Sequence, residues 1–192
     1  ILFINLITNT DFSIHFIIVL YFIFYKYIYM PSIISHGIIG YSLFGYEGIF
    51  WSTLPDLIGF TSYFSRIGYD YLKGNFLKKE FNRPSPDLMN KNDWMMYDLS
   101  HSLLFWIVLL FIFKKKEIYA AIISVILDIF LHDKEGWRGP KFLYPLSDYN
   151  FDGIKWDSSL GFTITFTIII LLLNLSDDKK NKIIHKFYLP DD

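Results

Sequence analysis

Hydrophobic residues in this chain are gathered into long runs, and shorter polar segments separate these runs. The most apolar stretches cover residues 12–30, 97–113, 118–133 and 159–175. A helix needs about 20 predominantly apolar residues to cross a bilayer. We therefore predict an all-α fold, a polytopic membrane helical bundle with about four transmembrane helices.

A fifth apolar stretch, residues 33–50, is interrupted by glycines at 37, 40, 45 and 48 and contains Glu47. Glycine weakens a helix and permits conformations that other residues avoid. This stretch therefore predicts a bent or short helix rather than a full span. Residues 61–97 are polar and predict an extramembrane loop with one short amphipathic helix.

The distribution of these runs suggests three parts of the chain. We assign residues 1–29 to an N-terminal hydrophobic anchor helix, residues 30–178 to a membrane-embedded domain and residues 179–192 to a polar C-terminal tail. A signal peptide fits residues 1–29 less well, because no basic stretch precedes the apolar run and no small-residue cleavage site follows it. Translated upstream sequence is the alternative, since Met30-Pro31-Ser32 resembles the natural start of a domain.

Composition agrees with a multi-pass integral membrane protein. The chain is 53% hydrophobic and 20% aromatic, with a mean hydropathy of +0.31. Its formal net charge of −1 argues against nucleic acid as the main partner. The expected partners are membrane lipids and other membrane subunits. Because cysteine is absent, a transition-metal site would have to use histidine and carboxylate ligands.

Two short spacings place acids and histidines together inside the apolar runs. These are Asp98-x-x-His101 and Asp128-x-x-x-His132. Residues three or four apart lie on one face of a helix. The tight charged turn at 114–117 predicts an antiparallel helical hairpin, which brings both pairs to the same depth. A divalent metal site is the predicted reason for charged groups in such a place.

His36 and Asp56 are two further candidates. Along a straight helix, residues 20 positions apart would be separated by about 30 Å. They can share one site only if the chain folds back between them, which Gly45 and Gly48 allow.

Several motifs, taken in order, resemble the YdjM-like membrane-associated metal-dependent hydrolases. They are MPSIISHGIIG, LPDLIG, YDLSHSLLFW, VILDIFLHD and FLYPLSDYNFDGIKW, and they cover about residues 30–175. The resemblance implies a metal site formed by His36, Asp56, His101 and Asp128, with Ser100 and Ser102 beside His101. Ser124 departs from the pattern, because the family usually has a histidine four residues before the last Asp. His132, four residues after that Asp, is where some relatives place one.

The leading hypothesis is a membrane-embedded, metal-dependent hydrolase acting at the membrane surface, with a lipid-derived phosphoester as substrate. One or two divalent ions, Zn²⁺ first and Mn²⁺ or Mg²⁺ as alternatives, would be held by His36, Asp56, His101, Asp128 and His132. Asp98 or Asp133 would accept the proton. Asp98 could instead be a helix N-cap. The second hypothesis is a catalytically inactive structural or accessory subunit of a larger membrane complex, which Ser124 and the extra N-terminal segment favour.

Overall fold

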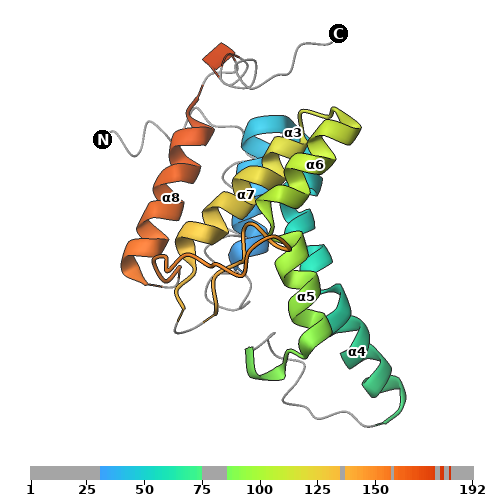
Figure 1. Ribbon diagram of the computed structural model, residues 1–192. Coiled ribbons are helices and arrows are strands. Elements are labelled where there is room, and N and C mark those ends of the chain that lie inside the picture. The colour runs from blue at the N-terminus through green and yellow to red at the C-terminus, as the bar shows by residue number, and fades with distance from the viewer. Residues whose placement is uncertain are drawn as a thin grey trace.

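The computed structural model describes residues 31–74, 86–134, 137–156 and 158–175, together with 178, 179 and 182. Within this part the chain is helical and contains no strand, so the predicted all-α class is confirmed. The elements are α3 (Pro31–Gly59), α4 (Thr61–Leu72), the short 3₁₀ helix η1 (Pro86–Leu88), α5 (Lys91–Ser100), α6 (Leu103–Phe113), α7 (Ile118–Leu131) and α8 (Ser159–Leu173). In Figure 1, α6, α7 and α8 lie in the upper part of the molecule with α3 behind α7, and α4 and the start of α5 extend away below them.

The element α3 is a helical hairpin with a sharp reversal at Gly45. Gly45 has φ 65° and ψ −148°, a conformation that favours glycine. The two limbs, 31–44 and 46–59, then approach each other closely at Gly40 and Gly48. A Cβ on either glycine would collide with the backbone carbonyl of the other. The predicted fold-back is therefore confirmed, and glycines make it possible at both the turn and the crossing.

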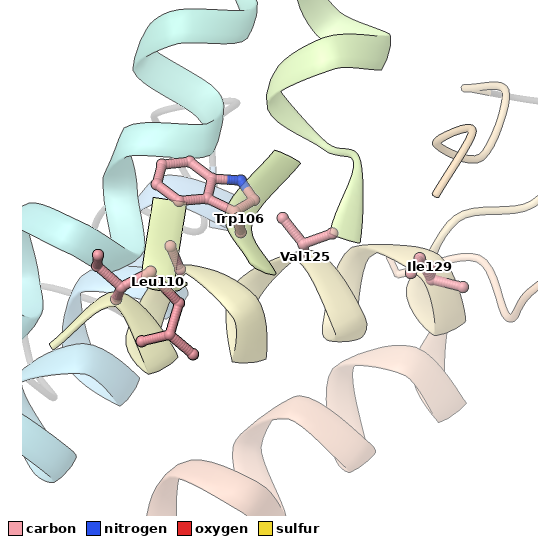
Figure 2. Packing of buried hydrophobic residues seen from close by; sticks show 6 residues of the cluster. Trp106, Leu110, Val125 and Ile129 are labelled. Carbon is pink, nitrogen blue, oxygen red and sulfur yellow. The ribbon is translucent and has the colours of Figure 1, made fainter. Parts of the chain in front are cut away.

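The helices α6 and α7 form the predicted hairpin. The turn begins at Lys114, which ends α6 in the left-handed conformation and donates its backbone N–H to the Leu110 carbonyl at 2.8 Å. Trp106 and Leu110 of α6 pack with a row of small and branched residues of α7, including Val125 and Ile129 (Figure 2). This apolar contact fixes α6 against α7 and thereby sets the position of residues at the far end of the hairpin.

The run 97–113 is broken into two helices rather than one. α5 and α6 are bent by 54° at residues 101 and 102. Ser102 begins α6 by accepting a hydrogen bond from the Phe105 backbone N–H. The next backbone N–H, that of Leu103, donates to the Phe142 carbonyl in the loop after α7 at 2.8 Å. The break therefore puts His101 at a helix junction.

The polar region 61–97 is more helical than predicted. α4 buries Tyr63 and Ile67 against a cluster that contains Tyr97 and Met89. α5 begins at Lys91 because Asn90 caps it, with Asp93 completing a capping box. The additional helical structure in this region depends on the Asn90 cap and on aromatic packing. Neither can be predicted from hydropathy.

No single described helix is long and apolar enough to cross a bilayer. The pair α5 and α6 passes a test of length and composition together, but across its bend. The predicted anchor at 1–29 and most of the predicted tail at 179–192 lie outside the described residues.

Candidate metal centre

Two histidines and two aspartates from four separate helical segments meet in the interior. His36 comes from the first limb of α3, Asp56 from its second limb, His101 from the α5–α6 junction and Asp128 from α7. Each of the four residues is at most 3% exposed. The α3 hairpin pairs the first two, and the packing of α7 on α3 brings Asp128 to them.

The four side chains alternate around a closed ring. Asp128 directs Oδ1 to His36 Nε2 at 3.1 Å and Oδ2 to His101 Nε2 at 3.5 Å. Asp56 directs Oδ2 to His36 Nε2 at 3.7 Å and Oδ1 to His101 Nε2 at 3.3 Å. Each carboxylate therefore divides its two oxygens between the two imidazoles.

This spacing fits a bound divalent ion. Ligand atoms about 2.0–2.2 Å from a tetrahedral zinc ion are separated from each other by about 3.3 Å. The contacts of His36 Nε2 with Asp56 Oδ2 and Asp128 Oδ1, at 3.7 and 3.1 Å, lie near this value, whereas His101 contacts the other oxygen of each carboxylate. Donor atoms of His36, Asp56 and Asp128 all lie within 4.8 Å of one another. These three converge most closely, and His101 contacts both carboxylates beside them.

The two buried carboxylates of the ring also need a compensating positive charge. Within the described part of the chain, the ion pairs of Asp56 and Asp128 are all with histidines. Oδ2 of Asp56 and Oδ2 of Asp128 are buried and have no hydrogen-bond partner there. Because an ionised carboxylate is costly to bury without compensation, two of them beside neutral imidazoles need either protons or a metal ion.

His101 is held in the orientation that a metal ligand requires. Its Nδ1 lies 3.0 Å from the Tyr97 carbonyl oxygen and 3.0 Å from the Ser100 Oγ, so a hydrogen on Nδ1 would have an acceptor. The Tyr97 ring stacks on the imidazole with a centroid distance of 4.1 Å. In the tautomer with this hydrogen, the lone pair is on Nε2 and faces both carboxylates. Such support from a backbone carbonyl is typical of metal-bound histidines.

His36 is the group that responds most strongly to the carboxylates. Burial by itself lowers the pKa of His36, but the charge of Asp128, the hydrogen bond to it and the charge of Asp56 together raise that pKa to about 9. Without a metal ion, a proton on His36 Nε2 therefore bridges the carboxylates at neutral pH. A divalent ion would replace this proton.

The structure does not bring His132 into the ring. It lies just beyond α7, and its Nδ1 donates to the Asp128 backbone carbonyl at 2.8 Å. The same nitrogen is 3.9 Å from Asp128 Oδ1. The i, i+4 spacing of Asp128 and His132 therefore allows His132 to donate a hydrogen bond to a backbone carbonyl at the C-terminal end of α7, where carbonyls lack helical partners.

The two predicted proton acceptors lie outside the ring as well. Asp98 is buried and pairs with Arg138 at 2.6 Å and with Lys141 at 3.6 Å. It is not an N-cap, because it lies near the end of α5 and the caps of α5 and α6 are Asn90 and Ser102. Asp133 is half-buried just after α7. Ser124 is fully buried one turn before Asp128, and its hydroxyl has no partner in the described part of the chain.

Sequence reasoning missed the contribution of the loop after α7. Arg138 lies in a segment rich in glycine, proline and tryptophan, where no helical spacing relates it to Asp98. The sequence analysis also does not predict the stacking of Tyr97 on His101, although the two residues are four apart on one helix face. A search for basic residues in loops that flank an acidic helix end would have found Arg138.

Comparison with protein-family models, curated proteins and solved structures gives no match for this chain. The site is therefore interpreted from its geometry.

Proposed function

We propose that the chain is a membrane-associated, metal-dependent hydrolase with one divalent ion held by His36, Asp56 and Asp128 and with His101 beside it. The observation that carries this proposal is the sharing of two buried carboxylates between two histidine Nε2 atoms. Buried structural salt bridges more often use arginine, whose guanidinium keeps its charge. Histidine and aspartate together are the usual ligands of zinc and related ions in a protein without cysteine.

The chemistry follows from the ligand set. A bound divalent ion lowers the pKa of a coordinated water and polarises a phosphoryl or acyl oxygen. The protein positions the ligands, with the Tyr97 carbonyl as an acceptor for His101 Nδ1 and α7 fixing Asp128. Burial of the ring limits access of bulk water to it. We propose Zn²⁺ as the ion, with Mn²⁺ as the alternative.

Association with lipid is supported by the surface of α6. This helix is apolar on every side, yet only Trp106 and Leu110 of it are buried. Phe111 and Ile112 are 61% and 65% exposed. Three exposed lysines follow directly at 114–116, as expected where a helix reaches charged headgroups. The candidate centre, with His101 and Asp128, lies at the other end of the α6–α7 hairpin from these lysines.

A structural or accessory role is the second candidate, and one observation favours it. If all four side chains bind the same tetrahedral ion, no coordination position is left for water, which is the pattern of structural zinc sites. A catalytic site instead keeps one position open. Ser124, in place of the additional histidine, supplies no further ligand for a second ion.

Metal analysis of the purified full-length chain tests the proposal. We expect about one ion per chain in the wild type and a loss of most of it in Asp128→Asn. Asp148→Asn is the matched control, because this carboxylate is exposed and pairs with Lys141. Equal metal content in Asp128→Asn and wild type would contradict the proposed metal site.

Activity separates the two candidate functions. The zinc-loaded chain is assayed against chromogenic phosphate monoesters, phosphate diesters and acyl esters. Hydrolysis that is lost in Asp128→Asn and retained in Asp148→Asn supports the hydrolase. A stoichiometric ion without hydrolysis of any class supports the structural role.

A further inference from the structure

A pair of basic side chains lies beside the candidate metal centre. Arg138 and Lys141, from the loop after α7, both contact Asp98 of α5. Asp98 is three residues before His101. Arg138 and Lys141 therefore lie at the C-terminal end of α5, next to the part of the chain that contributes His101 to the candidate centre. The Arg138 guanidinium also lies 4.0 Å above the Trp94 ring. Stacking and pairing together fix the plane of the guanidinium.

The cluster contains two cations and two carboxylates, and of the two carboxylates only Asp98 is buried. Asp98 is the one buried carboxylate that contacts both Arg138 and Lys141 within the described chain. The second partner of Lys141 is Asp148, whose side chain is 87% exposed. Lys141 lowers the pKa of Asp148, which is therefore ionised, but solvent screens its charge. Two cations thus face one buried carboxylate.

One buried hydrogen-bond donor in the same area has no acceptor. The Nε–H of Arg138 is buried without a partner in the described part of the chain. Trp94 lies beneath Arg138, and its ring centroid is 5.7 Å from that of Tyr97. The Tyr97 ring also stacks on the His101 imidazole, with a centroid distance of 4.1 Å. Buried donors of this kind are normally satisfied by an acceptor.

We propose that Arg138 and Lys141 form an oxyanion subsite that binds the phosphate group of a phosphoester beside the metal centre. This inference rests on the proposed function and names its substrate class. Arg138 uses one Nη for Asp98 and has Nε–H available for an oxygen of the ligand. A guanidinium suits this task because its donors match the spacing of phosphate oxygens. Lys141 adds a second positive charge on the same side.

Asp98 has a defined role in this subsite. It holds Arg138 in place when no ligand is bound, and it competes with the phosphate for the same cation. Neutralising Asp98 should therefore strengthen anion binding, whereas a purely structural ion pair predicts the opposite. This difference in sign makes the inference testable by binding alone.

Titration calorimetry of the zinc-loaded, full-length chain with inorganic phosphate is the test. Arg138→Gln should weaken binding about tenfold or more, as expected for the loss of a charge-assisted hydrogen bond. Asp98→Asn should bind phosphate several-fold more tightly than wild type. Lys134→Gln, which removes an exposed positive charge near the same loop, is the matched control and should change little.

Several outcomes would overturn the subsite. Equal weakening in Arg138→Gln and Lys134→Gln would indicate general electrostatics, and weakening in Asp98→Asn would indicate a structural pair. If Arg138→Gln does not fold, Lys141→Met provides the same comparison. Metal content is measured for each protein. A wild type that holds no ion contradicts the metal centre. A bound ion together with an unchanged phosphate affinity in Arg138→Gln contradicts only the subsite.

Vesicles distinguish the source of the phosphate. Wild type and Arg138→Gln are sedimented with phosphatidylcholine vesicles that contain or lack phosphatidic acid. Arg138-dependent binding to phosphatidic acid without binding of free phosphate assigns the subsite to a lipid headgroup. Arg138-dependent binding of free phosphate assigns it to a soluble phosphoester. Independence from Arg138 in both assays overturns the proposal.

Discussion

Two buried acidic regions of this molecule differ in their partners. Asp128, at the candidate metal centre, contacts His36 and His101. Asp93, at the start of α5, contacts Arg66 at 2.9 Å and accepts the Asn90 backbone N–H. Both aspartates are at most 3% exposed. The comparison teaches that burial alone does not mark a functional carboxylate, whereas a partner that can exchange a proton for a metal ion does.

The largest expected effect is the removal of metal from the histidine-paired region. An ion present at 1,000 times its Kd adds about 4 kcal/mol to the free energy of unfolding. Chelation should therefore lower the melting temperature of wild type strongly, as measured by thermal denaturation. Asp128→Asn should show no response to chelator, because it no longer binds the ion. Asp93→Asn should respond like wild type, and a wild type indifferent to chelator would contradict the distinction between the regions.

A pH dependence should also separate the two regions. His36 has a folded pKa of about 9, above its ordinary value of 6.5. Its protonation therefore stabilises the metal-free protein fully below about pH 6.5, and this contribution is lost as the pH rises through 9. We expect the unfolding free energy of the metal-free protein to fall by about 1–3 kcal/mol between pH 6.5 and 10.

Denaturant unfolding at a series of pH values, with chelator present, measures this loss. His36→Gln is the control and should remove most of the slope. Zinc-loaded wild type should lack the slope too, because the ion replaces the proton. A slope that persists unchanged in His36→Gln would assign it to other groups.

The sequence predicted those features that depend on nearby residues. Charged residues inside apolar runs indicated Asp128 and His101, and the glycine at 45 indicated the reversal that joins His36 to Asp56. These side chains do meet in the structure, because helix geometry and the freedom of glycine are local properties. His132 shows the limit of spacing alone, since an i, i+4 relation also permits a side chain to close its own helix end.

Features set by contacts between distant segments could not be predicted in this way. The bend at 101–102 depends on the loop after α7, whose Tyr144 carbonyl accepts the Ser102 hydroxyl at 2.7 Å. The pairing of Asp98 with Arg138 joins residues 40 positions apart. Hydropathy carries no information about either contact, so the proton-acceptor role predicted for Asp98 did not anticipate its arginine partner.

Asp93→Asn tests the arginine-paired region with a smaller effect. The substitution removes the charge facing Arg66 and weakens the capping box at Asn90, so we expect a loss of about 1–3 kcal/mol of unfolding free energy. Metal content should stay at the wild-type value. Chemical denaturation and metal analysis of the same preparation check both points. A loss of metal in this variant would mean that the two regions are coupled.

The smallest expected effect concerns Ser124, which is buried near the histidine-paired region. It is buried one turn before Asp128, but its hydroxyl has no partner in the described part of the chain. Removing a buried polar group that makes no hydrogen bond is close to neutral or stabilising. Ser124→Ala should therefore change the unfolding free energy by less than about 0.5 kcal/mol and leave metal content unchanged. If metal content instead falls, the hydroxyl or a water bound to it contributes to the centre, and the ligand ring is larger than four side chains.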